Sequence, residues 1–235
     1  MKQILFSCAF VLICVSSVLA INGDLAGQGE YPYVGSVRWP KFPTGTNNYC
    51  TAIVLNNNWA LAPENCARYS GTTDQIQLGS VILPYYTHYV ATRIAHPDYN
   101  YPLYNAILLQ MTAPFDLSDP VKVAPAILPE ATSTVPVGTQ GYIAAYGADP
   151  NDQQDNHMRK VQVTVVDNSE CGYSGESLLL CAKAAVGGAC SWDLGAPLTV
   201  NGVVVGFSTS EGCQGTPFLL VATAPLVDWI NSNVN

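Results

Sequence analysis

The sequence has few charged residues, and few of those are basic. Charged side chains make up 11% of the 235 residues, and nine lysines and arginines stand against seventeen acidic residues, giving a formal net charge of −8. Such a chain repels the phosphates of nucleic acids and the headgroups of anionic membranes. We therefore expect no nucleic-acid or membrane partner and read the acidity as a source of solubility.

Several patterns that carry chemistry are also missing. No Cys-x-x-Cys pair of the zinc-knuckle kind occurs, and no Asn-x-Ser/Thr sequon is present. None of the histidines His88, His96 and His157 lies beside a Gly-x-Ser-x-Gly motif, and His96 is expected on a loop surface. We expect no cofactor and no metal ion.

Only one long apolar run is present, at the start of the chain. Lys2 precedes the apolar stretch from Ile4 to Val15, and small residues follow up to Ala20. This is the pattern of a secretory signal peptide, and the run is too short to span a bilayer comfortably. We expect residues 1–20 to be removed and the mature chain, residues 21–235, to be a secreted, extracellular monomer.

Six of the eight cysteines lie in this mature chain. An even number in a secreted chain favours three disulfides, and six cysteines allow fifteen pairings. Spacing alone does not choose among these pairings.

Short runs rich in Val, Ile, Thr and Tyr alternate with Gly, Pro and Asn, which is typical of an all-β sandwich or barrel. Asn201-Gly202 is a strong signal for a two-residue hairpin turn. Residues 120–136 predict a linker between two halves, and residues 224–233 predict one terminal helix opened by Pro225. The predicted strands are 33–37, 52–55, 60–61, 76–78, 107–111, 141–145, 161–166 and 203–207.

Several blocks resemble the trypsin/chymotrypsin family of serine proteases, in the same order. Residues 21–24, Ile-Asn-Gly-Asp, resemble the mature N-terminus Ile-Val-Gly-Gly, and residues 96–100, His-Pro-Asp-Tyr-Asn, are a common family phrase. Residues 53–62 resemble Leu-Ile-x-x-x-Trp-Val-Leu-Ser-Ala, and Trp229-Ile230 stands where the family's terminal helix has it. The resemblance covers nearly all of the mature chain.

The resemblance implies two six-stranded antiparallel β-barrels of the chymotrypsin-like type, a former active site between them and a C-terminal α-helix. The first barrel is expected over about 21–119, the linker over 120–136, the second barrel over 137–223 and the helix over 224–233. The implied disulfides are Cys50–Cys66, Cys171–Cys181 and Cys190–Cys213.

The family's catalytic residues are missing at the matching positions. Asn65 stands at the histidine of Ala-Ala-His-Cys, Ala106 at the aspartate of Asn-Asp-Ile-x-Leu, and Leu194 at the serine of Gly-Asp-Ser-Gly-Gly-Pro. An amide is no useful base, and alanine and leucine supply neither a carboxylate nor a nucleophile. The resemblance therefore implies an inactive protease homologue with no catalytic residues.

The substrate-binding features are altered as well. Trp192 replaces the glycine whose N–H helps to form the oxyanion hole, and its indole is expected to obstruct that hole. Gly188 stands at the base of the specificity pocket, where trypsins have an aspartate. Ser210 and Phe218 stand at wall positions that are often glycine, and Phe218 is expected to fill the pocket.

Asp193 is retained beside these losses. In active family members the matching aspartate pairs with the freed N-terminal ammonium, so we expect Ile21 and Asp193 to form that ion pair after signal removal. The alternative is that Asp193 only caps its loop. A buried aspartate without a partner is costly, which favours the ion pair.

A retained scaffold without its chemistry suggests that the protein acts by binding. The chain resembles inactive relatives of arthropod digestive and salivary proteases, so the implied role is that of a decoy, competitor or modulator. The expected partner is a protease, a protease inhibitor or a host defence protein. Residual hydrolysis by another nucleophile and a ligand-binding or structural role remain alternatives.

A tyrosine cluster is the candidate binding surface. Tyr99, Tyr101 and Tyr104 lie in the loop expected to border the former cleft, and tyrosine offers large, rigid contact area. The alternative is that some of these side chains are buried in the first barrel.

Overall fold

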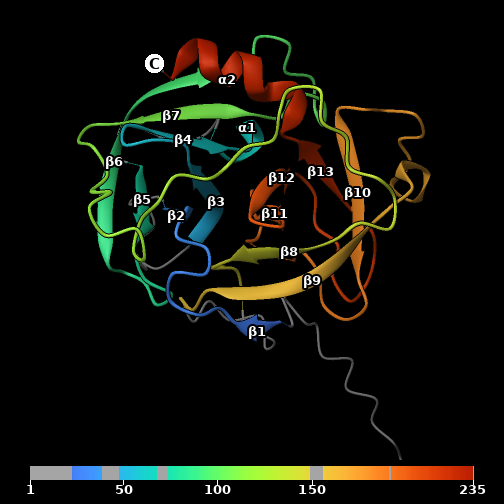
Figure 1. The fold of residues 1–235 in the computed structure, drawn as a ribbon, viewed down its shortest axis with the longest axis horizontal. Coiled ribbons are helices and arrows are strands. Elements are labelled where there is room, and N and C mark those ends of the chain that lie inside the picture. Colours follow the sequence, from blue (N-terminus) through green and yellow to red (C-terminus); the bar gives the residue numbers. More distant parts are fainter. Residues whose placement is uncertain (1–22, 39–47, 68–73, 149–155, 191, 235) are drawn as a thin grey trace, which may run out of the picture.

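The computed structural model describes residues 23–38, 48–67, 74–148, 156–190 and 192–234. The predicted all-β class is confirmed: the chain forms two closed six-stranded antiparallel barrels and a C-terminal helix (Figure 1). The first barrel contains β2 (Val34–Arg38), β3 (Asn48–Val54), β4 (Trp59–Ala62), β5 (Gln75–Leu78), β6 (Tyr86–Ala95) and β7 (Ile107–Met111). Around this barrel the strands follow the order β2-β3-β4-β7-β6-β5.

The second barrel follows the linker in sequence. It contains β8 (Gln140–Ala145), β9 (Arg159–Val166), β10 (Leu179–Ala184), β11 (Pro197–Val200), β12 (Val203–Ser208) and β13 (Phe218–Ala222). The strands follow the order β9-β10-β13-β12-β11-β8, and the pairing of β8 with β9 closes the barrel. Between β11 and β12, Asn201 and Gly202 have φ values of 50° and 82°, as the predicted two-residue turn requires.

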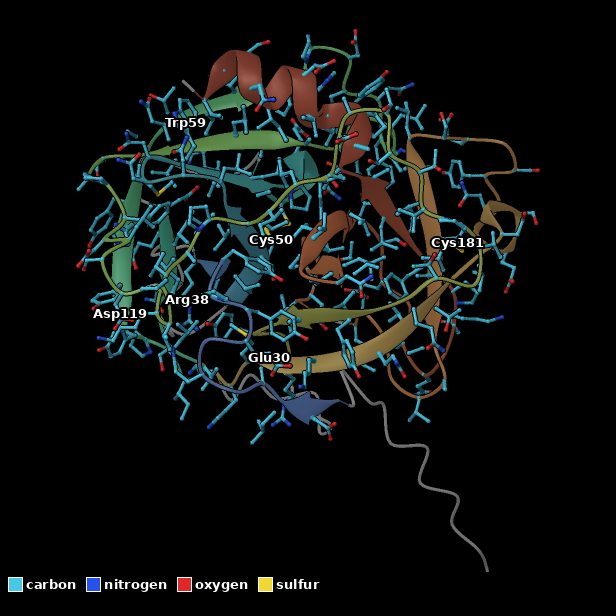
Figure 2. All side chains as sticks on the ribbon, viewed as in Figure 1. Glu30, Arg38, Cys50, Trp59, Asp119 and Cys181 are labelled. Atoms are coloured by element: carbon cyan, nitrogen blue, oxygen red, sulfur yellow. A yellow bond between two sulfur atoms is a disulfide. The ribbon has the colours of Figure 1, made fainter. Side chains whose placement is uncertain are left out.

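The barrels share buried apolar contacts where they meet. One hydrophobic cluster joins Ile53 and Leu108 of the first barrel to Phe207 and Val221 of the second. β2 is buried over its whole length, because it also contacts β8 of the other barrel. The side chains in Figure 2 fill the interior of both barrels.

The C-terminal segment returns to the first barrel. A short 3-10 turn, η2 (Ala224–Leu226), leads into α2 (Val227–Asn233), so the predicted helix has a tighter first turn. Ile230 packs into the shared cluster, and the Asn56 side chain donates a hydrogen bond to the carbonyl of Val234 (2.9 Å). Among the described residues, no helix is long and apolar enough to cross a membrane.

The start of the described chain differs from the predicted division into barrels. β1 (Asp24–Leu25) lies in the segment assigned to the first barrel, 21–119, yet it pairs with Arg159 and Lys160 of β9 in the second. The reason is an open edge: β10 pairs with β9 only from Val163 onward, which leaves backbone groups near the start of β9 for another strand.

The six cysteines form three disulfides, and the pairs are those that the resemblance implies. Cys50–Cys66 joins β3 to the short helix α1 (Glu64–Ala67) of the first barrel. In the second barrel, Cys171–Cys181 joins the 3-10 turn η1 (Asn168–Cys171) to β10, and Cys190–Cys213 joins two loops. Each disulfide therefore lies within one barrel. Figure 2 labels Cys50 of the first barrel and Cys181 of the second.

Candidate functional site

The three positions assigned to the triad meet near the junction of the barrels. Asn65 lies on α1, and its backbone N–H donates to Oδ1 of Asn105 (2.9 Å). Asn105 Nδ2 donates in return to Oδ1 of Asn65 (2.9 Å) and also to the hydroxyl of Thr209. Asn105 is fully buried and Thr209 belongs to the second barrel, so one amide ties α1 to the opposite barrel.

Ala106 follows Asn105 and leads into β7. It is fully buried, its N–H donates to the carbonyl of Tyr104 (2.7 Å), and its own carbonyl accepts from His96 N–H (3.0 Å). Its methyl group has no atom that could ionise or orient a base.

Leu194 lies in the loop that precedes β11. Its carbonyl accepts from the N–H of Thr51 on β3 (2.7 Å), and its half-buried side chain packs against the shared hydrophobic cluster. The next residue, Gly195, has a φ of 88°, and a Cβ there would lie 2.2 Å from the Thr51 carbonyl oxygen and 2.8 Å from Cδ of Pro63. Only glycine allows this approach, which presses the loop against the start of α1.

Two serine hydroxyls near this junction are engaged in structural hydrogen bonds. Ser208 Oγ donates to the carbonyl of Asp193 (2.6 Å) and accepts from Ala196 N–H (3.1 Å). Ser210 Oγ accepts from Leu219 N–H (2.9 Å). A serine becomes a nucleophile when an adjacent base accepts its proton, and these bonds lead to backbone groups instead.

His96 is buried, so the prediction that it lies on a loop surface is wrong. Its ring stacks on Tyr104 with centroids 4.4 Å apart and meets Trp229 of α2 at 4.8 Å. Nδ1 accepts from Asp98 N–H (3.2 Å), and burial lowers the pKa of the imidazole. These neighbours come from distant segments, and they give His96 a packing role.

Asp193 is fully buried directly before Leu194. Its Oδ2 accepts from Cys190 N–H (3.0 Å), whereas its Oδ1 has no hydrogen-bond partner among the described residues. Burial raises the pKa of Asp193 well above its usual range, and the backbone N–H groups of Cys190 and Gly147 offset only part of that rise. The predicted partner, Ile21, lies outside the described residues.

Trp192 has a backbone conformation that suits glycine. Its φ is 73°, a left-handed value that costs a non-glycine residue about 1–3 kcal/mol. The side chain is 37% exposed. A bulky residue thus holds the backbone conformation that the resemblance assigns to the glycine of the oxyanion hole.

Phe218, at a predicted wall position of the specificity pocket, is tightly packed. This side chain is 1% exposed, and a Cβ at Gly212 would lie 2.5 Å from the Cβ of Phe218. A Cβ at Gly188 would lie 1.8 Å from the carbonyl oxygen of Gly212, so the backbones of these two glycines are in contact. Ser210, the other wall position, accepts a hydrogen bond from the N–H of Leu219.

The tyrosine cluster divides into exposed and packed members. Tyr101 is 49% exposed, and its hydroxyl donates to the carbonyl of Thr209 in the other barrel (3.2 Å). Tyr104 has a φ of 51° and stacks on His96, and Tyr99 is half-buried. Tyr101 is therefore the main exposed aromatic surface of this cluster. Within the described ranges, no group of three or more metal-ligating side chains occurs.

Two antiparallel barrels with a loop-lined junction define the chymotrypsin-like class of protein. Residues 20–230 match the family described as Trypsin, and the chain belongs to this family.

The relatives differ in length. The chain is 27% identical to mouse Transmembrane protease serine 11E over 246 residues, which cover 93% of this chain and 55% of that protein. It is 27% identical to Trypsin of Simulium vittatum over 233 residues, which cover 89% of this chain and 93% of that protein. The chain thus spans about half of the mouse protein and most of the Simulium trypsin.

Solved structures support the same fold. Human heparin binding protein superimposes with a TM-score of 0.79 at 22% identity, covering 92% of this chain and 96% of that one. Neuropsin from mouse brain superimposes with a TM-score of 0.77 at 21% identity, covering 91% of this chain and 99% of that one. At this identity the likeness concerns the fold alone.

The Asn105 amide yields a prediction about stability. We expect Asn105→Ala to lower the free energy of unfolding by about 2–4 kcal/mol, because it removes the bonds of this amide to the half-buried Asn65 and to the buried hydroxyl of Thr209. Urea unfolding measures this loss. The matched control is Asn100→Ala, an exposed residue of the same loop, for which we expect a change within about 0.5 kcal/mol. Equal losses in the two variants would contradict the tie between the barrels.

Proposed function

We propose that this protein is a secreted, non-catalytic member of the trypsin family that acts by binding another protein. The proposal depends chiefly on the junction of the barrels, where the amides of Asn65 and Asn105 bond to each other and to Thr209. With Ala106 and Leu194 as neighbours, these side chains supply no base, no carboxylate and no activated nucleophile for acyl transfer.

Two further features support an inactive site. The indole of Trp192 stands where the resemblance assigns a glycine, and the bulky, buried Phe218 stands where the resemblance assigns a small residue of the pocket wall. An acyl-transfer enzyme needs both an oxyanion hole and room for the substrate.

A protein partner fits the exposed surface at the junction. Tyr101 and Trp192 are large aromatic side chains that are 49% and 37% exposed, and such residues dominate the binding energy of many interfaces. The candidate partners are a protease, a protease inhibitor or a host defence protein. The human structural neighbour is named for binding heparin, a polyanion, whereas the net charge of −8 here opposes such a ligand.

The first test is catalytic. We expect no covalent labelling of the purified protein by a serine-directed phosphonate and no turnover of a broad peptide library, because Ser208 and Ser210, the serines described at the junction, bond to backbone groups and not to a base. An active trypsin processed in parallel is the positive control. Stoichiometric labelling, or turnover that survives purification, would favour the alternative of a hydrolase with another nucleophile.

The second test concerns binding. In a pull-down from secretions or host plasma, we expect Tyr101→Ala to lose most of the captured partner, because the exposed ring is removed while the fold keeps its core. Tyr142→Ala is a matched control, since Tyr142 is also an exposed tyrosine, 40% accessible, on β8. If Tyr101→Ala captures as much partner as the unmodified protein, this surface is not the binding site.

We also propose that Asp193 pairs with the Ile21 ammonium once residues 1–20 are removed. A buried carboxylate with one unpaired oxygen is unstable as an anion, and an ammonium at that oxygen would remove the penalty. The ion pair would then lower the pKa of Asp193, and its contribution to stability would be lost as pH falls through that lowered value. Without the pair, burial raises the pKa, and stability is lost as pH rises through the raised value.

Two forms of the chain separate these cases. In a form that begins at Ile21, we expect Asp193→Asn to cost about 3–5 kcal/mol at pH 7, because it breaks a buried ion pair. In a form with extra residues before Ile21, we expect the same change to be neutral or stabilising at pH 7. Urea unfolding between pH 4 and pH 8 measures both, and an identical effect in the two forms would refute the ion pair.

A further inference from the structure

A pocket away from the triad positions lies between the linker and the second barrel. Its volume is about 360 Å³, and its lining shares no residue with the junction formed by Asn65, Ala106 and Leu194. In Figure 1 the linker, drawn in yellow-green, passes beside β10 before it enters β8. The pocket is built from this stretch of linker and from parts of β9, β10, β12 and β13.

Valines, leucines, alanines and prolines form most of the wall of this pocket, and the polar residues Ser133, Thr134, Asn168 and Ser177 also line it. Val165, Leu179 and Leu180 are 2%, 1% and 8% exposed and belong to strands that line it, so the wall is made of well-packed core side chains. Val135 of the linker covers them from outside, and Val137 at the rim is 65% exposed. This volume falls at the lower end of small-molecule pockets, which suits a compact apolar group.

The mouth of the pocket is acidic. Asp167 and Glu176 line it, and none of the described lining residues is a lysine or an arginine. Asp167 Oδ1 accepts from the N–H and hydroxyl of Ser169, which lowers the pKa of this carboxyl, and Glu176 Oε1 accepts from Leu178 N–H (2.9 Å). The lysine on the neighbouring strand, Lys183, pairs with Glu170 (2.8 Å) outside the pocket.

We propose that this pocket binds a small amphipathic molecule with an apolar body and a cationic head, such as an alkylamine or arylamine. The apolar part is removed from water by the valine and leucine walls, and the ammonium lies between the carboxylates of Asp167 and Glu176. The carboxylates of Asp167 and Glu176 repel anionic amphiphiles such as fatty acids. This site is independent of the proposed protein-binding surface, since the two share no residue.

The test uses three ligands with one eight-carbon tail and different heads. Titration calorimetry of the unmodified protein at pH 7 is performed with octylamine, octanol and octanoate. We expect octylamine to bind with a stoichiometry of one and about tenfold more tightly than octanoate, with octanol between them, since exposed ion pairs are worth up to about 1 kcal/mol each. Binding of octanoate as tight as that of octylamine, or no binding of any of the three, overturns the proposal.

Two sets of variants locate the site. Val135→Phe fills the pocket from the linker and is expected to abolish binding of all three ligands, whereas Val186→Phe, at an exposed residue outside the lining, leaves binding unchanged. Asp167→Asn with Glu176→Gln keeps the acceptor oxygens and is expected to bring octylamine down to the affinity of octanol. Glu170→Gln, on the same turn but outside the pocket, is its control. Octylamine binding that survives both pocket variants places the ligand elsewhere and refutes the site.

Discussion

The side-chain amide of Asn105 connects the parts on which the whole junction depends. It is fully buried, it accepts from the backbone of Asn65, and it donates both to the side chain of Asn65 and to Thr209 across the barrels. A primary amide has two donor hydrogens and a carbonyl oxygen, so one uncharged group can satisfy partners on both sides. The junction is therefore held together without any buried charge at the Asn65 and Ala106 positions.

This neutral arrangement contrasts with the loop next to it. Asp193 is a buried carboxyl whose Oδ1 has no hydrogen-bond partner among the described residues, and Trp192 has a left-handed backbone that favours glycine. Both features are unfavourable by themselves. Both fit the proposal made above, in which Asp193 pairs with the Ile21 ammonium.

Sequence reasoning predicted the barrels well where local chemistry decides the structure. The strand at 107–111 has the predicted bounds, and the Asn201-Gly202 turn has the left-handed backbone that its residue types favour. The strand β6 was not predicted. Polar residues such as Thr92 and Arg93 weaken its apolar alternation, and Val90 is the only fully buried residue of its ten.

The parts of the site that were missed depend on contacts between distant segments. Nothing local to Asn105 indicates a bond to Thr209, which lies 104 residues away in sequence. The burial of His96 depends on Tyr104 and on Trp229 of α2, and the pocket beneath the linker depends on four strands meeting Val135. The linker was predicted as a connection only, since composition does not reveal what a connecting segment covers.

The return of α2 to the first barrel has a consequence for the integrity of the molecule. None of the three disulfides joins the barrels, so apart from the backbone of the linker no covalent bond of the described chain connects the two halves. Ile230 and the Asn56–Val234 hydrogen bond nevertheless anchor the end of the second half on the first. A protease that cuts the linker would therefore produce two fragments that stay associated and separate only in denaturant.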